Sequence, residues 1–548
     1  MTPRSSASAI RHIIGIDIST QTVTAMLIGV VEEDGSPAEL VVSGAWMESR
    51  PCRDEISRKN PAVWLELVRE CVAGLKKTAR EAELAEAIGV GTTFPGCFAV
   101  LADGSVDPQF ASLYDNTHDA GICGGVFDEA LGRAESETLN RMWPGNMAIG
   151  LAHLVRSGGL RLEGVARIVP PNTAFAYELL GAAGCGPDPD GLFSDFTQTA
   201  ISGLYNARSG EPVPAGVADL LRRAAPEIDP DQLRKLLPGA EPSWRNVVSG
   251  EAVGAVRELL GLPKLASVSI GAGDSSLGTL ALMGDRETVI NVRGSSDSPM
   301  ILVDAPKPCA GPRETVLHFP LPTATCLSDA PWCVVAPMLR SGRVWDWVRN
   351  LRFAEGEPDA DAKLEALALE ALTSRRGGSP CPPTFGRHGD RPLQASGDGP
   401  PLRFDTALGG ERAPLWDAQA TGSIVGLVES HGIGDIAVAA LEGMSSTLSE
   451  CIKLMESRYG IQTSRLLLVG GPARNKLWNW ITQAGTGKQT FATTFSDASL
   501  LGAALLGYGA LYDGSEADPH IAQRLLALSR LSSSHPLVAP VQTELSGL

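Results

Sequence analysis

The sequence is short of three things: paired cysteines, histidines and basic charge. Its ten cysteines include no C-x-x-C pair, and its eight histidines show no ligand spacing with them, so we expect neither a disulfide framework nor structural zinc. This cysteine usage favours a reducing compartment, the cytoplasm. Lysine and arginine number 46 against 63 acidic residues, a net charge of −17. Nucleic-acid and anionic-membrane partners are therefore not expected, because both need a basic surface.

The sequence also lacks a recognisable leader or membrane segment. Residues 1–12 contain no apolar h-region, so no secretory signal is expected. The apolar run at residues 13–31 includes Asp17 and several hydroxyl residues, and strands explain it better than a membrane span does. A hydrophobic content of 43% and a charged content of 20% are typical of a globular protein. The length of 548 residues predicts two or more domains.

The first hundred residues predict a mixed sheet that carries helices. Apolar runs bounded by turn residues indicate strands, and Asn60 followed by Pro61 indicates the start of a helix with an apolar stripe. The expected elements are, in order, strand 13–17, polar turn 19–22, strand 23–31, strand 40–46, a helix from 61, strand 88–92 and strand 97–101.

The first hairpin turn has a chemical use. A turn rich in hydroxyls and backbone amides can hold phosphate, and the adjacent carboxylate of Asp17 can hold Mg²⁺ through water. The alternative is a plain N-terminal hairpin with an acidic residue at its turn. The pattern returns later as strand 288–292, the turn Gly294-Ser295-Ser296 and strand 299–303. This echo predicts two related halves that each begin with a phosphate-binding hairpin.

A glycine turn near the middle of the chain carries a second acidic residue. The stretch Gly271-Ala272-Gly273-Asp274-Ser275-Ser276 lies between an expected strand at 265–270 and a helix at 277–283. Glycines allow the backbone to approach a ligand closely, and the Asp274 carboxylate would then point into that space. The alternative is an aspartate that only caps a helix.

Four further stretches have readings of their own. The polar run 193–199 suits a sugar or plain turns, and residues 374–401 read as a surface loop. Asp435 is expected to cap a long helix. Strand 466–469 leads into Gly470-Gly471 and a helix, which places amides where a nucleotide could bind.

Taken in order, four motifs resemble the FGGY family of carbohydrate kinases within the actin-like ATPase superfamily, over roughly residues 12–512. The motifs are Gly15-Ile16-Asp17 with Ser19-Thr20, then 271–276, then 409–417, then 470–475 followed by 497–504. The resemblance implies an α/β fold of two RNase H-like domains, each a mixed five-stranded sheet flanked by helices, around a central cleft. Residues 1–262 would form the sugar-binding domain and residues 263–548 the ATP-binding domain.

The resemblance also implies roles for single residues. Asp274 would be the general base, and Asp17 would organise Mg²⁺ and the phosphates of ATP. The nucleotide would further contact Ser19, Thr20, Gln21, Gly294, Ser295, Gly470, Gly471 and Asn475. The substrate would contact Phe94, Pro95, Gly96, Asp115, Asn116 and Ser275.

The chain departs from the family pattern around the substrate. Thr24 stands where a lysine or arginine is common, and Arg293 could replace that cation. The substrate loop is Thr93-Phe94-Pro95-Gly96. The usual Trp-x-Asp-x-Arg stretch is replaced by residues 114–118, which begin with Tyr114. Pro472 stands where the family has a glycine. The resemblance implies an ATP-dependent kinase for a ketose such as xylulose or ribulose, since 409–417 is nearest the xylulose-kinase form. Three alternatives stay open: a kinase for glycerol, erythritol or another sugar, a non-catalytic pseudokinase, and an actin-like ATPase with a protein partner. A homodimer is also possible under each of them.

Overall fold

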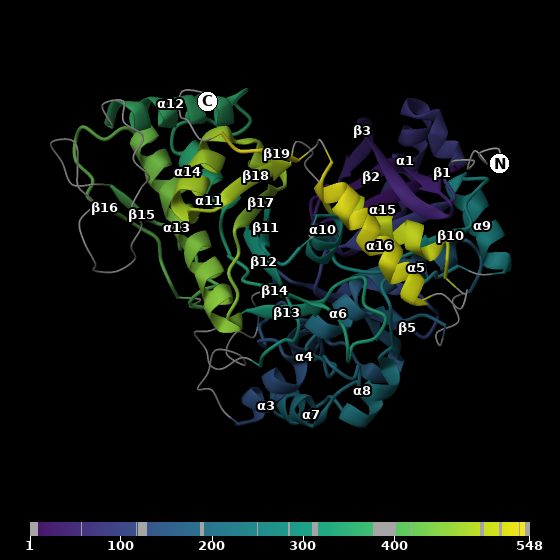
Figure 1. Ribbon diagram of the computed structural model, residues 1–548. Helices are drawn as coiled ribbons and strands as arrows, with labels where there is room; N and C mark the ends of the chain where they lie inside the picture. Colours follow the sequence, from purple (N-terminus) through teal and green to yellow (C-terminus); the bar gives the residue numbers. More distant parts are fainter. Residues whose placement is uncertain are drawn as a thin grey trace, which may run out of the picture.

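The computed structural model describes residues 9–55, 57–116, 118, 129–186, 191–248, 250–282, 285–308, 316–375, 402–417, 419–493, 498–513, 518–535 and 538–542. Thr117, Asp497 and residues 376–401 of the expected loop lie outside these ranges. Within them the chain forms two large sheets and a helical lobe, which lies at the bottom of Figure 1.

The first sheet has five strands in the order β10-β4-β1-β2-β3. Its strands are β1 (Ala9–Ile18), β2 (Thr22–Glu33), β3 (Ser36–Pro51), β4 (Ala87–Thr92) and β10 (Ser267–Ser269). Strand β1 pairs antiparallel with β2 and parallel with β4, which confirms the predicted hairpin. Residues 13–18 of β1 are buried on both faces, which is why that stretch reads as a continuous apolar run.

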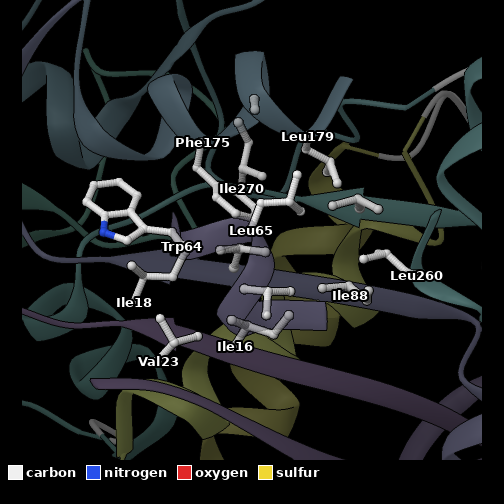
Figure 2. Close-up of a cluster of buried hydrophobic side chains, with 14 of the residues drawn as sticks. Ile16, Ile18, Val23, Trp64, Leu65, Ile88, Phe175, Leu179, Leu260 and Ile270 are labelled. Atoms are coloured by element: carbon white, nitrogen blue, oxygen red, sulfur yellow. The ribbon is translucent and has the colours of Figure 1, made fainter. Parts of the chain in front are cut away.

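Three helices cover one face of this sheet: α1 (Pro61–Thr78), α5 (Pro171–Ala182) and α9 (Glu251–Leu260). Figure 2 shows their side chains, among them Trp64 and Phe175, packed against Ile16 and Ile88 of the strands. Helix α1 begins as predicted: Asn60 Oδ1 accepts a hydrogen bond from the Ala62 amide at 3.1 Å, and Pro61 occupies the first helical position.

The second sheet has seven strands in the order β13-β14-β12-β11-β17-β18-β19. They are β11 (Thr288–Arg293), β12 (Asp297–Val303), β13 (Leu317–Pro320), β14 (Trp332–Val335), β17 (Arg465–Val469), β18 (Gln489–Thr493) and β19 (Val538–Pro540). Strand β11 pairs antiparallel with β12 and parallel with β17, so both halves share one pairing pattern. The expected five strands are the inner ones. The prediction missed β13 and β19 because short edge strands leave little pattern in a sequence.

The helices of the second half have clear bounds. They are α11 (Gly342–Asn350), α12 (Ala360–Arg375), α13 (Ile433–Tyr459), α14 (Lys476–Thr486), α15 (Ala498–Ala510) and α16 (Asp518–Ser533), beside a short hairpin of β15 (Arg403–Asp405) and β16 (Ser423–Val425). The sequence predicted that Asp435 caps α13, but the N-cap of this helix is Gly432. Asp435 lies one turn inside the helix, and its Oδ2 accepts the Gly432 amide at 2.8 Å.

The expected boundary at residues 262/263 does not separate the two sheets. Strand β10 lies beyond it and pairs with β4 of the first sheet. Helix α15 also returns to that sheet, and Figure 1 shows the yellow helices beside the purple strands. The approach is so close that a Cβ on Gly15 would lie 2.1 Å from Leu500 O, and one on Gly89 1.7 Å from Ala503 O. Glycine is therefore required at both positions.

The helical lobe is inserted between β4 and β10. It contains β5 (Gly96–Leu101), β6 (Val106–Leu113), β7 (Val165–Val169), α3 (Glu129–Thr138), α4 (Met147–Gly158), α6 (Phe196–Ile201), α7 (Ala215–Ala224) and α8 (Pro230–Leu236), next to the two-residue pair β8 (Ser194–Asp195) and β9 (Ala240–Glu241). Helix α10 (Asp274–Leu282) follows β10 and leads into the second half. Of the helices in the described residues, none combines the length and the apolar character that crossing a membrane requires.

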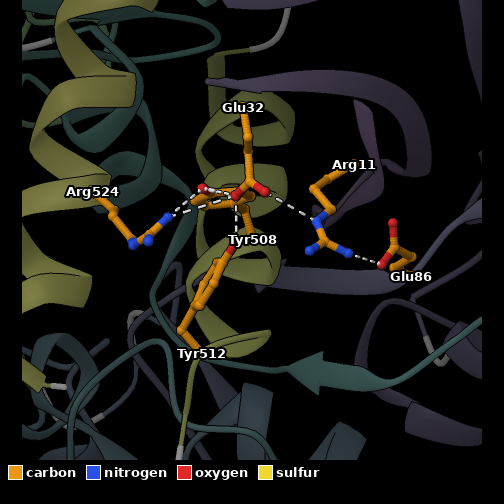
Figure 3. Close-up of polar contacts among 6 residues, drawn as sticks. All are labelled: Arg11, Glu32, Glu86, Tyr508, Tyr512 and Arg524. Carbon is orange, nitrogen blue, oxygen red and sulfur yellow. Dashed lines mark hydrogen bonds and ion pairs between the residues drawn. The ribbon is translucent and has the colours of Figure 1, made fainter. Parts of the chain in front are cut away.

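A buried carboxylate ties the last two helices to strand β2 (Figure 3). Glu32 accepts hydrogen bonds from Tyr508, at 2.6 Å, and from Tyr512, and Arg11 Nε donates to it at 3.2 Å. Arg524 approaches to 3.6 Å. Burial raises the pKa of Glu32, but these hydrogen bonds outweigh it and hold the pKa below its usual value.

Candidate active site

The parallel strands β10, β4 and β1 end at one edge of the first sheet. Asp17 is the ninth residue of β1, Thr93 follows β4, and Asp274 follows β10. The Thr93 amide donates to Ile18 O at 2.8 Å, and Thr92 pairs with Gly273 in a parallel bridge. The topology therefore brings both predicted aspartates to the same sheet edge, although 257 residues separate them (274 − 17).

The Asp274 turn is built tightly. Ala272 has φ of +74°, and its amide helps to offset the rise that burial causes in the pKa of Asp195. A Cβ on Gly273 would lie 2.1 Å from the Phe94 ring, so only glycine fits there. Asp274 is the first residue of α10, where the helix dipole favours a negative charge. Its Oδ1 accepts the Ser275 amide at 2.6 Å, and its side chain is partly exposed.

The polar run 193–199 supports this turn. Asp195 is fully buried and accepts hydrogen bonds from Thr197 Oγ1 at 2.6 Å, Ser243 Oγ at 2.9 Å and Asn172 Nδ2 at 2.8 Å. Burial raises the pKa of Asp195, and these bonds partly offset that rise. Of the two readings that the sequence leaves open, sugar contact or plain turn, the geometry favours a structural role.

The first hairpin turn is organised by its own hydroxyl. Ser19 Oγ accepts the Gln21 and Thr22 amides at 3.3 and 3.1 Å and donates to Thr22 O at 3.0 Å. Thr20 is partly exposed, and it lies near enough to the Tyr114 hydroxyl to lower the pKa of Tyr114. The turn lies directly after Asp17, but two of its amides are already satisfied by Ser19.

The predicted nucleotide turns lie together at the edge of the second sheet. The Gly294 amide donates to Ser296 O at 2.8 Å, and Ser295 is exposed. Gly470 has φ of +107°, and a Cβ on it would lie 2.1 Å from Arg293 O. Asn475 uses its Oδ1 to accept the Trp478 amide at 2.7 Å, so it caps α14, while Gly471 remains partly exposed.

Arg293 does not serve as the cation expected near the phosphates. Its guanidinium is buried under the hairpin, where it donates to Asn479 Oδ1 at 3.3 Å and Thr482 Oγ1 at 3.1 Å and lies over the Trp478 ring at 4.3 Å. Burial lowers its pKa, and nearby Asp297 opposes that shift. Its position at the end of β11 turns the side chain toward α14.

The predicted substrate residues form two groups. Phe94, Pro95 and Gly96 are buried beside Gly273. The Phe94 ring packs edge-on against the Phe319 ring, with 5.9 Å between the ring centroids. Asp115 is exposed, whereas Asn116 Nδ2 donates to Pro144 O at 3.1 Å and so braces its own loop. Ser275 Oγ lies 3.3 Å from Asp274 Oδ1.

The sequence reading missed Tyr114 and Arg412. Arg412 Nη2 donates to the Tyr114 carbonyl at 3.2 Å, which joins segments 298 residues apart. Burial raises the pKa of Tyr114, and the charges of Asp274 and Asp115 raise it further, whereas Thr20 and Arg412 oppose them. Arg412 belongs to the Gly-Glu-Arg stretch at 410–412, a signal that could have marked it.

The arrangement suits Mg²⁺ held mainly by a nucleotide. Asp17 supplies one carboxylate at the strand end, and Mg²⁺ binds through one or two carboxylates together with phosphates and waters. Within the described ranges, no group of three or more histidine, cysteine or acidic side chains could hold a metal ion by itself. Asp17 therefore fits a shared, water-mediated role better than a complete protein site.

Two mixed sheets of matching strand pairing, each opening with a hairpin, define an actin-like two-domain fold. Residues 294–511 match the model of the FGGY family of carbohydrate kinases, C-terminal domain. The gluconokinase of Bacillus subtilis (strain 168) is 26% identical over 281 residues, 51% of this chain and 49% of that protein. Residues 294–511 are therefore similar to the C-terminal domain of the FGGY family of carbohydrate kinases, and about half of the chain is similar to a gluconokinase.

Solved structures agree with the fold over nearly the whole chain. The gluconate kinase from Lactobacillus acidophilus has a TM-score of 0.68 and 18% identity, covering 96% of this chain and 97% of that one. The ligand-bound xylulose kinase from the same organism has the same TM-score and identity and covers 95% and 97%. By sequence, however, the chain spans about half the length of the gluconokinases that it matches.

Proposed function

We propose that this chain transfers the γ-phosphoryl group of ATP to a hydroxyl of a small sugar. The observation that carries the proposal is the meeting of Asp274, Asp17 and the first hairpin turn at one sheet edge. The nucleotide would lie against the turns at Gly294 and Gly470 in the second half. Phosphoryl transfer needs positioning and charge neutralisation more than covalent help, and this geometry is suited to both.

Asp274 would act as the general base. Its carboxylate accepts the proton of the acceptor hydroxyl while the new O–P bond forms and the bond to ADP breaks. Asp17 would hold Mg²⁺ through water, and the ion would neutralise part of the phosphate charge. Thr20 and Ser295, which are partly exposed and exposed, would donate hydrogen bonds to phosphate oxygens.

The proposed acceptor is a ketose such as xylulose or ribulose, on the strength of the 409–417 stretch. An aldonate such as gluconate is the second candidate. Two observations favour it: the gluconokinase match extends over 51% of the chain, and the Arg412 guanidinium donates to the Tyr114 carbonyl beside the predicted substrate residue Asp115. A guanidinium can bind a sugar carboxylate in a bidentate manner.

The test measures ADP release with ketoses, aldoses, polyols and gluconate, for the parent and for Asp274→Asn. We expect sugar-dependent turnover, and a kcat about 10²- to 10⁴-fold lower in the variant because the base is lost while its size is kept. Asp103→Asn, an exposed turn residue of the same half, is the matched control. If no sugar stimulates ADP release and Asp274→Asn behaves as the parent, the chain is a binding protein instead.

A further inference from the structure

Three arginines of the second half converge beside the second hairpin turn. The Arg343 amide donates to Ser295 O at 3.3 Å, and the Gly342 amide donates to Gly294 O at 3.0 Å, so the start of α11 lies against the turn. Arg340 Nη2 donates to Gly409 O at 3.4 Å. The segments 337–343 and 409–413 therefore run side by side, and a small cavity lined by Arg340 and Glu411 lies between them.

Arg412 completes the group from the second of these segments. The Ala413 amide donates to Pro337 O at 3.0 Å, which fixes the backbone next to Arg412. Its guanidinium donates to the Tyr114 carbonyl of the first half at 3.2 Å. Asp274 and Thr20 both shift the pKa of Tyr114, so Arg412 binds a residue that lies near the proposed base and the first hairpin turn.

The three positive charges have no close counter-charge. No carboxylate in the described part of the chain lies within ion-pair distance of the Arg340, Arg343 or Arg412 guanidinium. Burial lowers the pKa of Arg412 and of Arg340, and the Arg343 charge lowers both further, while Tyr114 and Asp115 oppose the shift at Arg412. Like charges held together in this way favour an anionic ligand.

The proposed reaction needs such a cation. Charge gathers on the transferring phosphoryl group, and an arginine is well suited to stabilise it. The first hairpin turn, residues 19–22, contains no lysine or arginine, and Arg293 is buried under the second hairpin. Position 24 is a threonine whose Oγ1 lies 3.0 Å from Ser49 Oγ. The positive charge that stabilises the phosphoryl group must therefore come from side chains outside the two hairpin turns.

We propose that Arg340, Arg343 and Arg412 form an anion-binding site that receives the transferring phosphoryl group of ATP. The inference rests on the proposed kinase function and adds the source of its positive charge. As the acceptor oxygen attacks phosphorus, its proton passes to Asp274 and ADP leaves with the electron pair of the broken bond. The guanidinium groups stay charged throughout and gain no proton. A carboxylate of an acidic sugar is the other anion that could occupy the site.

The test uses Arg412→Gln and Arg343→Gln in the full chain. We expect kcat to fall about 10²- to 10³-fold for Arg412→Gln with a neutral sugar, while the KM for that sugar changes little. Arg412→Lys should recover part of the loss. Calorimetry without sugar should show each glutamine variant binding a non-hydrolysable ATP analogue at least tenfold more weakly, with ADP affinity unchanged. Arg286→Gln, whose guanidinium pairs with exposed Asp304, is the control.

The outcomes separate the possible ligands. Unchanged kcat and unchanged analogue binding in both glutamine variants would overturn the site. A defect confined to acidic sugars, seen as a raised KM, would overturn the assignment to the phosphoryl group and give the site to a sugar carboxylate. A parent that turns over no sugar, yet binds the ATP analogue through these arginines, would refute the kinase proposal while leaving the anion site standing. Arg343 is exposed, so its variant should fold even where Arg412→Gln does not.

Discussion

At the scale of single residues, the position of the proposed base depends on the missing side chain of Gly273. The Phe94 ring fills the space where a Cβ would stand, and Phe94 itself is only 9% exposed. The residue expected to touch the sugar thus also packs under the turn that carries Asp274. Whether it contacts a substrate remains a prediction.

We expect Gly273→Ala to reduce kcat by about 100-fold, because a shift of about 1 Å in a catalytic group costs on that order. Overpacking against Phe94 should also lower the free energy of unfolding by about 1–3 kcal/mol. Steady-state kinetics and urea unfolding measure the two effects. In a double-mutant cycle, Gly273→Ala should cost less stability when Phe94→Ala is already present, since the ring that it overpacks has been removed. A Gly273→Ala variant with parental kcat would contradict the role of this contact.

The sequence predicts roles for Asp17 and Asp274, which stay predictions, whereas it names Tyr114 and the 409–417 stretch without predicting that they meet. Asp17 and Asp274 each follow an apolar strand and accompany a turn, and both patterns are local. The Tyr114–Arg412 contact spans 298 residues and depends on how two halves approach one another. Arg293 was predicted to reach the phosphates because it precedes the second hairpin turn, but its side chain packs into the core. Local order alone does not give side-chain direction at the end of a strand.

At the scale of elements, strand β13 connects the second sheet to Phe94, which packs under the Asp274 turn. Its Phe319 ring contacts Phe94, and the amide of its His318 donates to Asn140 Oδ1 at 2.6 Å. The strand has four residues, too few to show a period, so the sequence, which marked β11, β12 and β17 of this sheet, did not mark this one. Yet through Phe319 it is one of the elements by which the second half packs against the Phe94 ring under the Asp274 turn.

We expect Phe319→Ala to lower both stability and kcat. Removing a fully buried ring costs about 3–5 kcal/mol of unfolding free energy, and Phe94 would lose its support beside Gly273. The control is Phe404→Ala in β15, a buried ring that contacts Trp347 at a centroid distance of 5.6 Å instead of lining the site. Kinetics at a temperature where both variants are folded should show a reduced kcat for Phe319→Ala alone. Equal kcat in the two variants would mean that β13 only adds stability.

At the scale of the whole molecule, the chain crosses between its two sheets more than once. The first sheet takes its last strand from beyond residue 262, and α15 and α16 return to it from the end of the chain. The sequence predicted two halves from the repeated hairpin, and the pairing of β1 and β11 confirms that repeat. It did not predict the return, because the apolar face of α15 fits either sheet. The glycines that admit this helix, Gly15 and Gly89, lie in the first quarter of the chain.

Glu32 helps to hold α15 and α16 against the first sheet through its hydrogen bonds, and this stabilisation should depend on pH. The pKa of Glu32 is lowered in the folded state, so the ionised form is the one that folding favours. Its contribution to stability is therefore complete above the ordinary carboxyl pKa and is lost as the pH falls through the lower folded value. Glu32→Gln should lower the free energy of unfolding at pH 7 by about 3 kcal/mol, since Arg11 and two tyrosines lose a charged acceptor.

Urea unfolding of the parent and of Glu32→Gln, repeated between pH 7 and pH 3, measures this dependence. The gap between the two proteins should stay constant down to the usual carboxyl pKa of about 4.3 and then narrow as Glu32 takes up a proton. Glu33→Gln, an exposed neighbour on the same strand, should leave the unfolding curve nearly unchanged at every pH. A gap that does not narrow in acid would show that the loss comes from altered packing. In that case, the charge of Glu32 would not be what holds α15 and α16 on the first sheet.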